Sequence, residues 1–97
     1  MTHRSRKLRE SARWAPHCFG CGLENPNHDL LCLAHSNALA DGRGTGHKSD
    51  DRSGAILCDR CHKDVDGLTG WDKDRKRAYH HKAHLRTLAW WKREGYL

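Results

Sequence analysis

The sequence predicts a small α+β domain with an additional helix at its C-terminal end. Three observations predict it: two Cys-x-x-Cys pairs, two short apolar runs between them, and a longer helical segment after the second pair. At 97 residues the chain forms one domain with a modest core. Only 36% of the residues are hydrophobic and 31% are charged, so this core needs the support of a disulfide or a metal.

The cysteines favour a metal. No apolar stretch of a secretory signal follows the N-terminus, and no run approaches transmembrane length. We therefore expect a reducing, cytoplasmic compartment, in which paired Cys-x-x-Cys motifs bind metal more often than they form disulfides. A structural zinc is expected on four thiolates: Cys18, Cys21, Cys58 and Cys61. Cys32 lies in an apolar run and is expected to be a small buried side chain.

The 36 residues between the two pairs must contain a substructure, because compact zinc ribbons need only roughly 15–20. Leu30–Ala34 is a short apolar run that predicts a strand, and it is followed by His35. Residues 36–51 are polar and glycine-rich and predict a long loop. Ala55–Leu57 predicts a second strand that leads into Cys58. The zinc would then join the two ends of an inserted hairpin.

Two helices are predicted after the hairpin. The first begins at Asp59 and carries His62, and Gly67 and Gly70 end it. The second is longer, with Asp72 as its N-terminal cap and an end before Gly95. Its buried face is expected to consist of Ala78, Leu85, Leu88 and Trp91.

The net charge of +6 and the pI of about 9.3 favour a polyanionic partner, nucleic acid first. Positive charge gathers near the N-terminus and in the last helical segment. We expect residues 1–16 to form a basic N-terminal arm, transiently helical over residues 1–13, and residues 17–97 to form the domain.

A second group of residues suggests catalysis. His62 directly follows the second cysteine pair, but a four-cysteine zinc site does not need it. Asp66 lies one helical turn later on the same face, so both could bind one cation. His35 would lie against this helix and could take a proton from water. Each also has a simpler explanation: an alternative zinc ligand or surface residue for His62, a surface charge for Asp66, and a half-buried histidine for His35.

The order of these motifs resembles that of the HNH, or ββα-metal, endonucleases, and most of all the YbcO type of phage and prophage nucleases. The resemblance covers roughly residues 17–97 and is carried by Leu33-Ala34-His35-Ser36-Asn37, Gly44-Thr45-Gly46-His47-Lys48-Ser49-Asp50-Asp51, Ala55-Ile56-Leu57-Cys58-Asp59-Arg60-Cys61-His62-Lys63-Asp64-Val65-Asp66 and Ala83-His84-Leu85-Arg86-Thr87. It implies a zinc-stapled ββα-metal core with an additional C-terminal helix.

The resemblance also implies catalytic roles for three residues. His35 matches the general base, His62 matches the metal-binding histidine of the helix, and Asp51 lies near the position of the Asn that orients the base. Ala34 stands where many HNH nucleases carry a further metal ligand. The missing ligand could be Asp66, Asp51 or His47, and the sequence does not choose among them.

The expected function is metal-dependent cleavage of DNA by a phage- or prophage-encoded enzyme in the cytoplasm of a bacterial host. The enzyme would hold a structural zinc and a catalytic divalent cation (Mg²⁺, Mn²⁺, Ni²⁺ or Zn²⁺), with no membrane partner, and could act as a homodimer. Phosphate contacts are expected from Lys48, Arg52, Lys73 and Arg77. Two alternatives are a non-catalytic nucleic-acid-binding module on the same scaffold and a phage adaptor protein.

Overall fold

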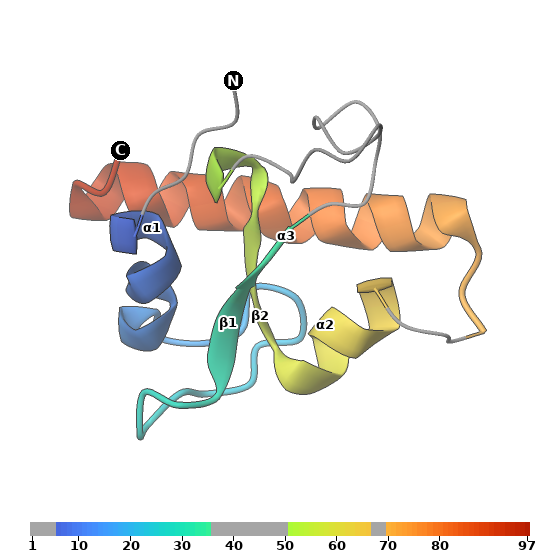
Figure 1. Ribbon diagram of the computed structural model, residues 1–97, viewed down its shortest axis with the longest axis horizontal. Helices are drawn as coiled ribbons and strands as arrows, with labels where there is room; N and C mark the ends of the chain where they lie inside the picture. The colour runs from blue at the N-terminus through green and yellow to red at the C-terminus, as the bar shows by residue number, and fades with distance from the viewer. Residues whose placement is uncertain (1–5, 36–50, 67–69) are drawn as a thin grey trace.

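The computed structural model describes residues 6–35, 51–66 and 70–97, with Asp66 described by its backbone alone. The described residues form a small α+β domain with three α-helices, two 3₁₀ turns and one two-stranded sheet (Figure 1). In chain order the elements are α1 (Arg6–Ser11), η1 (Ala12–Trp14), β1 (Leu31–Ala34), η3 (Asp51–Ser53), β2 (Ala55–Cys58), α2 (Asp59–Asp66) and α3 (Lys73–Glu94). None of the described helices is both long and apolar enough to cross a membrane.

The two strands form an antiparallel pair at the centre of the molecule. Leu31 lies opposite Cys58, and Ala34 lies opposite Ala55. All four residues of β2 are buried, and α2 begins at the residue that follows the strand. The expected strands and the order strand, strand, helix are therefore confirmed, and β2 fixes where α2 starts.

Gly54 allows β2 to begin close to its partner strand. A Cβ atom at this position would lie 2.6 Å from the Leu33 Cδ1 atom, closer than packed side chains approach. The Gly54 N–H also donates to the Asp51 carbonyl at 3.2 Å, which closes the η3 turn. The turn holds Asp51 at the entrance to β2.

Helix α3 crosses the hairpin along the length of the molecule (Figure 1). The Asp72 side chain accepts from the Arg75 N–H at 2.8 Å, and Gly95 has a left-handed φ of 84°. Both predicted ends of this helix are therefore confirmed. The cap and the αL residue satisfy backbone groups that have no partner inside the helix.

The predicted buried face of α3 is wrong at two positions, because Ala78 is exposed and 51% of Leu85 is exposed. The buried face instead contains His80 and Thr87. Three polar side chains of α3 bind backbone groups at the hairpin: His80 Nε2 to the Ala34 carbonyl at 2.9 Å, His84 Nδ1 to the Gly54 carbonyl at 2.8 Å, and the Ile56 N–H to Thr87 Oγ1 at 3.0 Å. A two-stranded sheet leaves such groups unpaired, so the helix that covers it needs polar residues on its inner face.

The N-terminal residues differ from the expected arm. Leu8, Ala12 and Ala15 are at most 2% exposed and belong to the same core as the hairpin and α3. Ser11 is also buried and accepts a 2.7 Å hydrogen bond from Trp91 Nε1. The described part of the segment 1–16 is therefore a docked helix and turn, because Leu8, Ala12 and Ala15 pack into the core and Ser11 binds Trp91 of α3, whereas Trp14 is 61% exposed.

Candidate zinc centre and active site

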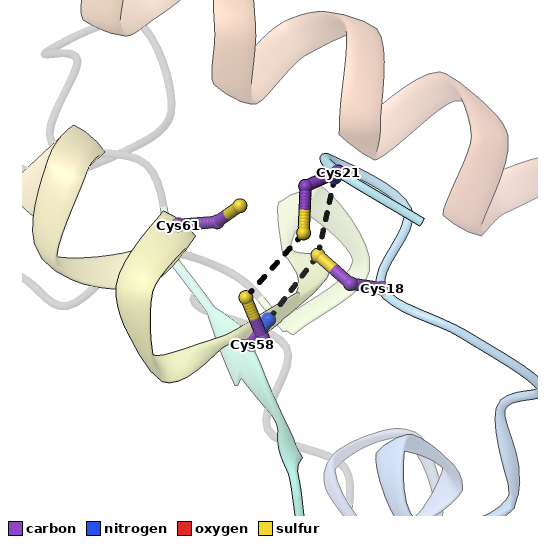
Figure 2. A group of neighbouring side chains, drawn as sticks. All are labelled: Cys18, Cys21, Cys58 and Cys61. Carbon is purple, nitrogen blue, oxygen red and sulfur yellow. Dashed lines mark hydrogen bonds between the residues drawn. The ribbon is translucent and has the colours of Figure 1, made fainter. Parts of the chain in front are cut away.

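Three elements bring four thiols together beside the hairpin. Cys18 and Cys21 lie on a tight turn closed by the Gly22 N–H, which donates to the Cys18 carbonyl at 2.9 Å. Cys58 is the last residue of β2, and Cys61 lies in the first turn of α2. The four sulfur atoms all lie within 4.8 Å of one another, and Figure 2 shows them around a common centre.

This arrangement fits a tetrahedral zinc. Zn–S bonds of about 2.3 Å place tetrahedral sulfurs about 3.8 Å apart. The Cys21 and Cys58 sulfurs are 3.7 Å apart. The Cys18 sulfur accepts from the backbone N–H groups of Gly20, Cys21 and Cys58 at 3.3, 3.4 and 3.3 Å. These donors stabilise negative charge on a thiolate. The predicted set of four thiol ligands is therefore brought together, and it is suited to a structural metal such as zinc.

The thiols affect one another's protonation. Burial raises the pKa of Cys61 to about 12 and also raises the pKa of Cys58. For Cys21, burial acts to raise the pKa, but hydrogen bonds from the Leu23 backbone and the other thiols outweigh it and lower the pKa to about 7. The metal-free cluster therefore keeps protons that a cation must displace when it binds.

Tyr79 of α3 also contacts the cysteine cluster. Its hydroxyl lies 3.1 Å from the Cys61 sulfur, and burial followed by this contact raises the pKa of Tyr79. A Cβ atom at position 20 would lie 2.8 Å from the Tyr79 hydroxyl, so the turn approaches α3 closely at Gly20. The cluster thus joins the Cys18–Cys21 turn, β2, α2 and α3.

A second polar group lies at the other end of the hairpin. His35 follows β1, and its Nε2 atom lies 2.5 Å from Oδ1 of Asp51. The Asp51 side chain is fully buried, and its Oδ2 atom lies 3.6 Å from Nε of Arg9 on α1. His35 keeps 26% of its side chain exposed. A buried carboxylate bound in this way fixes the orientation of an imidazole that still reaches solvent.

His62 lies on α2, half-buried and close to β1. Its Nδ1 atom is 3.4 Å from the sulfur of Cys32, which also lies 3.7 Å from the Leu57 carbonyl. Cys32 is therefore not the fully buried, apolar side chain expected from the sequence, since it is half-buried and has two polar neighbours. Burial, and then the nearby charges of Asp59, Cys58 and Cys18, raise the pKa of its thiol.

The remaining predicted site residues divide into two groups. Arg52, Lys73 and Arg77 are exposed, Arg52 in η3 and the other two in the N-terminal half of α3. His47, Lys48 and the side chain of Asp66 lie outside the described residues. Within the part of the chain that is described, the four cysteines are the one group of three or more potential ligands close enough to share an ion.

Sequence reasoning missed three residues of these sites. The sequence predicts that Arg9 belongs to a basic arm and that Cys32 packs as an apolar side chain, and it gives Tyr79 no role. No local pattern marks Tyr79 or Arg9, because each meets its partner from a distant part of the chain. The sequence does contain a signal for Cys32. It lies two residues before Ala34, so both side chains are on the same face of the predicted strand, and the HNH resemblance gives the position of Ala34 to a metal ligand.

Comparison with known proteins identifies the family of the chain. No curated protein and no solved structure matches the chain. The sequence model of one family, described as "Putative nuclease YbcO", matches residues 6–96. That match begins with α1 and includes the cysteine cluster, the hairpin and α3. The chain therefore belongs to the YbcO family of putative nucleases.

Proposed function

We propose that this protein is a metal-dependent DNA endonuclease of the HNH type that uses His35 as its general base. Membership of a nuclease family supports a nucleic-acid substrate. The order β1, β2, α2, with a histidine after β1 and another on α2, supports the HNH assignment. The observation that carries the proposal is the pair formed by His35 and buried Asp51.

The geometry of this pair suits proton abstraction. A carboxylate can only accept, so Nε2 of a neutral His35 carries the proton that it donates to Asp51. Nδ1 then has a free lone pair and makes no hydrogen bond to any of the described residues. In the proposed mechanism, Nδ1 takes a proton from water, and the water oxygen attacks the scissile phosphate. The imidazolium that forms is stabilised by the Asp51 carboxylate.

Arg9 supports the same step from α1. Its guanidinium lies beside Asp51, and 47% of its side chain is exposed. The positive charge favours the ionised form of a carboxylate that is otherwise fully buried. We infer that α1 belongs to the active site as well as to the core.

The catalytic cation would be held by His62, with Asp66 or His47 as further ligands. When bound, a divalent cation would polarise the scissile phosphate and stabilise charge on the leaving oxygen. Imidazole nitrogen and carboxylate oxygen are suitable donors for Mn²⁺, Ni²⁺ or Zn²⁺. Ala34 cannot contribute, because it is fully buried and its carbonyl is bound to His80.

Contacts to the DNA backbone are proposed for Arg52, Lys73, Arg77 and Lys48. The first three are exposed and positively charged. Such contacts hold a nucleic acid in register without reading its sequence, and they make affinity fall with salt.

The test is cleavage of supercoiled plasmid with Mg²⁺, Mn²⁺, Ni²⁺ or EDTA. The wild type should nick the plasmid in a metal-dependent way, and His35→Ala should lose cleavage while keeping one zinc per chain and its circular dichroism spectrum. His17→Ala is the matched control, because His17 is exposed and its ring contacts only that of Phe19 among the described aromatic rings. Cleavage by His35→Ala at the wild-type rate would refute the proposed base.

One structural fact favours the second candidate, a nucleic-acid-binding module without catalysis. The buried Ala34 replaces a metal ligand found in many HNH nucleases. Salt-sensitive DNA binding without cleavage in any metal would support that alternative.

A further inference from the structure

The thiol of Cys32 lies at a junction between the hairpin and α2. Cys32 pairs with Leu57 across the sheet, and its sulfur lies 3.7 Å from the Leu57 carbonyl oxygen. On the other side, 3.4 Å away, is Nδ1 of His62. The four zinc thiols form a separate group, to which Cys32 does not belong. The contact with His62 therefore does not use any of the four thiols of that group.

The direction of these two contacts follows from the available protons. A carbonyl oxygen can only accept, so the Cys32 S–H donates to Leu57. A thiol has one proton, and the contact to His62 is then made by a sulfur lone pair. When both contacts form together, Nδ1 of His62 carries the hydrogen that it donates to this sulfur. In a neutral imidazole the other nitrogen, Nε2, then holds the free lone pair.

We propose that Cys32 is a positioning residue that holds His62 as the Nδ1–H tautomer, with Nε2 as the atom that binds the catalytic cation. The inference rests on the proposed function in one respect, the role of His62 as a cation ligand. Histidine ligands commonly donate their second ring N–H to a neighbouring acceptor, which fixes the tautomer and the ring orientation. Loss of such a partner typically weakens metal binding by about 10–100-fold.

If Cys32 only packed against the core, as its neighbours do, it would not need a polar side chain. The immediate neighbours of Cys32 along the chain, Leu31 and Leu33, are apolar and pack against the core. A purely apolar side chain at position 32 would leave His62 Nδ1 without this partner. Helix α2 starts directly after Cys58, so a metal on the four cysteines would fix the position of the helix. The His62 side chain could still rotate about its χ angles. The Cys32 thiol restricts that rotation.

The experiment compares the full-length, zinc-loaded wild type with Cys32→Ala, Cys32→Val and Cys32→Ser. Long-range ¹H–¹⁵N correlation spectra report which ring nitrogen of His62 is protonated, with the signals assigned by their loss in His62→Gln. The wild type should show the Nδ1–H tautomer at neutral pH. Cys32→Ser should keep it, because a hydroxyl also donates and accepts. Cys32→Ala and Cys32→Val should shift towards the Nε2–H tautomer.

The second readout is the affinity for Mn²⁺ in the absence of nucleic acid, measured from the paramagnetic effect of Mn²⁺ on the NMR signals of the protein. Cys32→Ala should bind Mn²⁺ about 10–100-fold more weakly, and Cys32→Ser should stay near the wild type. An unchanged tautomer, or unchanged Mn²⁺ affinity, in both Cys32→Ala and Cys32→Val would overturn the inference. Zinc content and circular dichroism confirm folding, and Cys32→Val keeps the buried volume if Cys32→Ala does not fold.

These readouts need no cleavage, so they separate this inference from the proposed function. Absence of cleavage by the wild type in every metal, with the expected tautomer and Mn²⁺ changes in the variants, would support Cys32 as the positioning residue and reject the nuclease. Cleavage by the wild type, with no tautomer change in Cys32→Ala or Cys32→Val, would support the nuclease and reject the role of Cys32.

Discussion

The Nε2 atom of His35 lies 2.5 Å from Oδ1 of Asp51, a carboxylate with no exposed surface. The two residues flank the segment between β1 and η3, and the antiparallel pairing of the strands brings them together. A buried carboxylate without a partner would cost several kcal/mol. His35 and Arg9 are therefore both part of the reason that Asp51 can be buried.

Asp51→Asn should lower cleavage by about 10²–10⁴-fold without unfolding the protein. The amide has nearly the same shape but can donate to Nε2, which would favour the wrong tautomer of His35 and give no charge to stabilise the imidazolium. Plasmid nicking rates and thermal melts measure the two effects. Asp74→Asn, an exposed acid in the first turn of α3, is the control and should change neither. Equal activity of Asp51→Asn and wild type would contradict the role of the pair.

Arg9→Ala should lower the free energy of unfolding by about 1–3 kcal/mol and reduce cleavage, because buried Asp51 loses a charged partner. Urea denaturation measures the stability. Arg6→Ala is the matched control: Arg6 lies on the same helix but pairs with exposed Glu10, and 85% of its side chain is exposed. That pair should contribute less than about 1 kcal/mol. Similar losses in both variants would argue against a specific contact between Arg9 and Asp51.

Removal of the structural metal should unfold the domain. Structural zinc contributes about 10–16 kcal/mol in apparent terms to small domains, more than a core of this size supplies alone. A strong chelator, or Cys58→Ser, should abolish cooperative thermal unfolding and the dispersion of the NMR spectrum. Cys32→Ser is the matched control and should keep one zinc per chain. A fully cooperative transition after complete zinc loss would show that the cluster is dispensable.

Zinc binding should release protons and weaken as the pH falls. The raised pKa of Cys58 and the pKa of about 12 of Cys61 keep these thiols protonated at neutral pH without metal, and zinc binds thiolates. The free energy that zinc adds to folding is therefore present at high pH and is lost as protons compete at low pH. Calorimetric titration at pH 7 in buffers of different ionisation enthalpy should give about two or more protons released per zinc. Binding without proton release would mean that the free cluster is already ionised.

Thr87→Val should destabilise the protein by about 1–3 kcal/mol, because the buried Ile56 N–H would lose its acceptor while the side-chain volume stays the same. Thr87→Ser keeps the hydroxyl and should lose less. Chemical denaturation of the two variants gives the comparison. A larger loss in Thr87→Ser would mean that the threonine methyl group matters more than the hydrogen bond.

Local sequence was enough for the two strands, for α2 and α3, and for the candidate metal ligands, but not for the docked α1. Short apolar runs marked both strands, Asp72 and Gly95 marked the ends of α3, and spacing alone identified the four cysteines. These features depend on residues close together in the chain, where backbone preference and ligand spacing act directly.

The buried face of α3 could not be predicted in this way. Hydrophobic periodicity selected Leu85, which is exposed, and passed over His80 and Thr87, which are buried. The inner face includes His80 and Thr87 beside its apolar residues, and these two polar side chains bind backbone groups of the hairpin. These contacts arise only when the hairpin and the helix are packed together.

The sequence by itself determined which residues are candidates for the chemistry: four thiols suited to a structural metal such as zinc, and His35, Asp51 and His62 for the proposed nuclease site. Only the tertiary structure decided what each one contacts. It placed Asp51 between His35 and Arg9, Cys32 beside His62, and α1 in the core against Trp91. These partners come from distant parts of the chain, and their contacts depend on how the strands and helices pack, which no local pattern encodes.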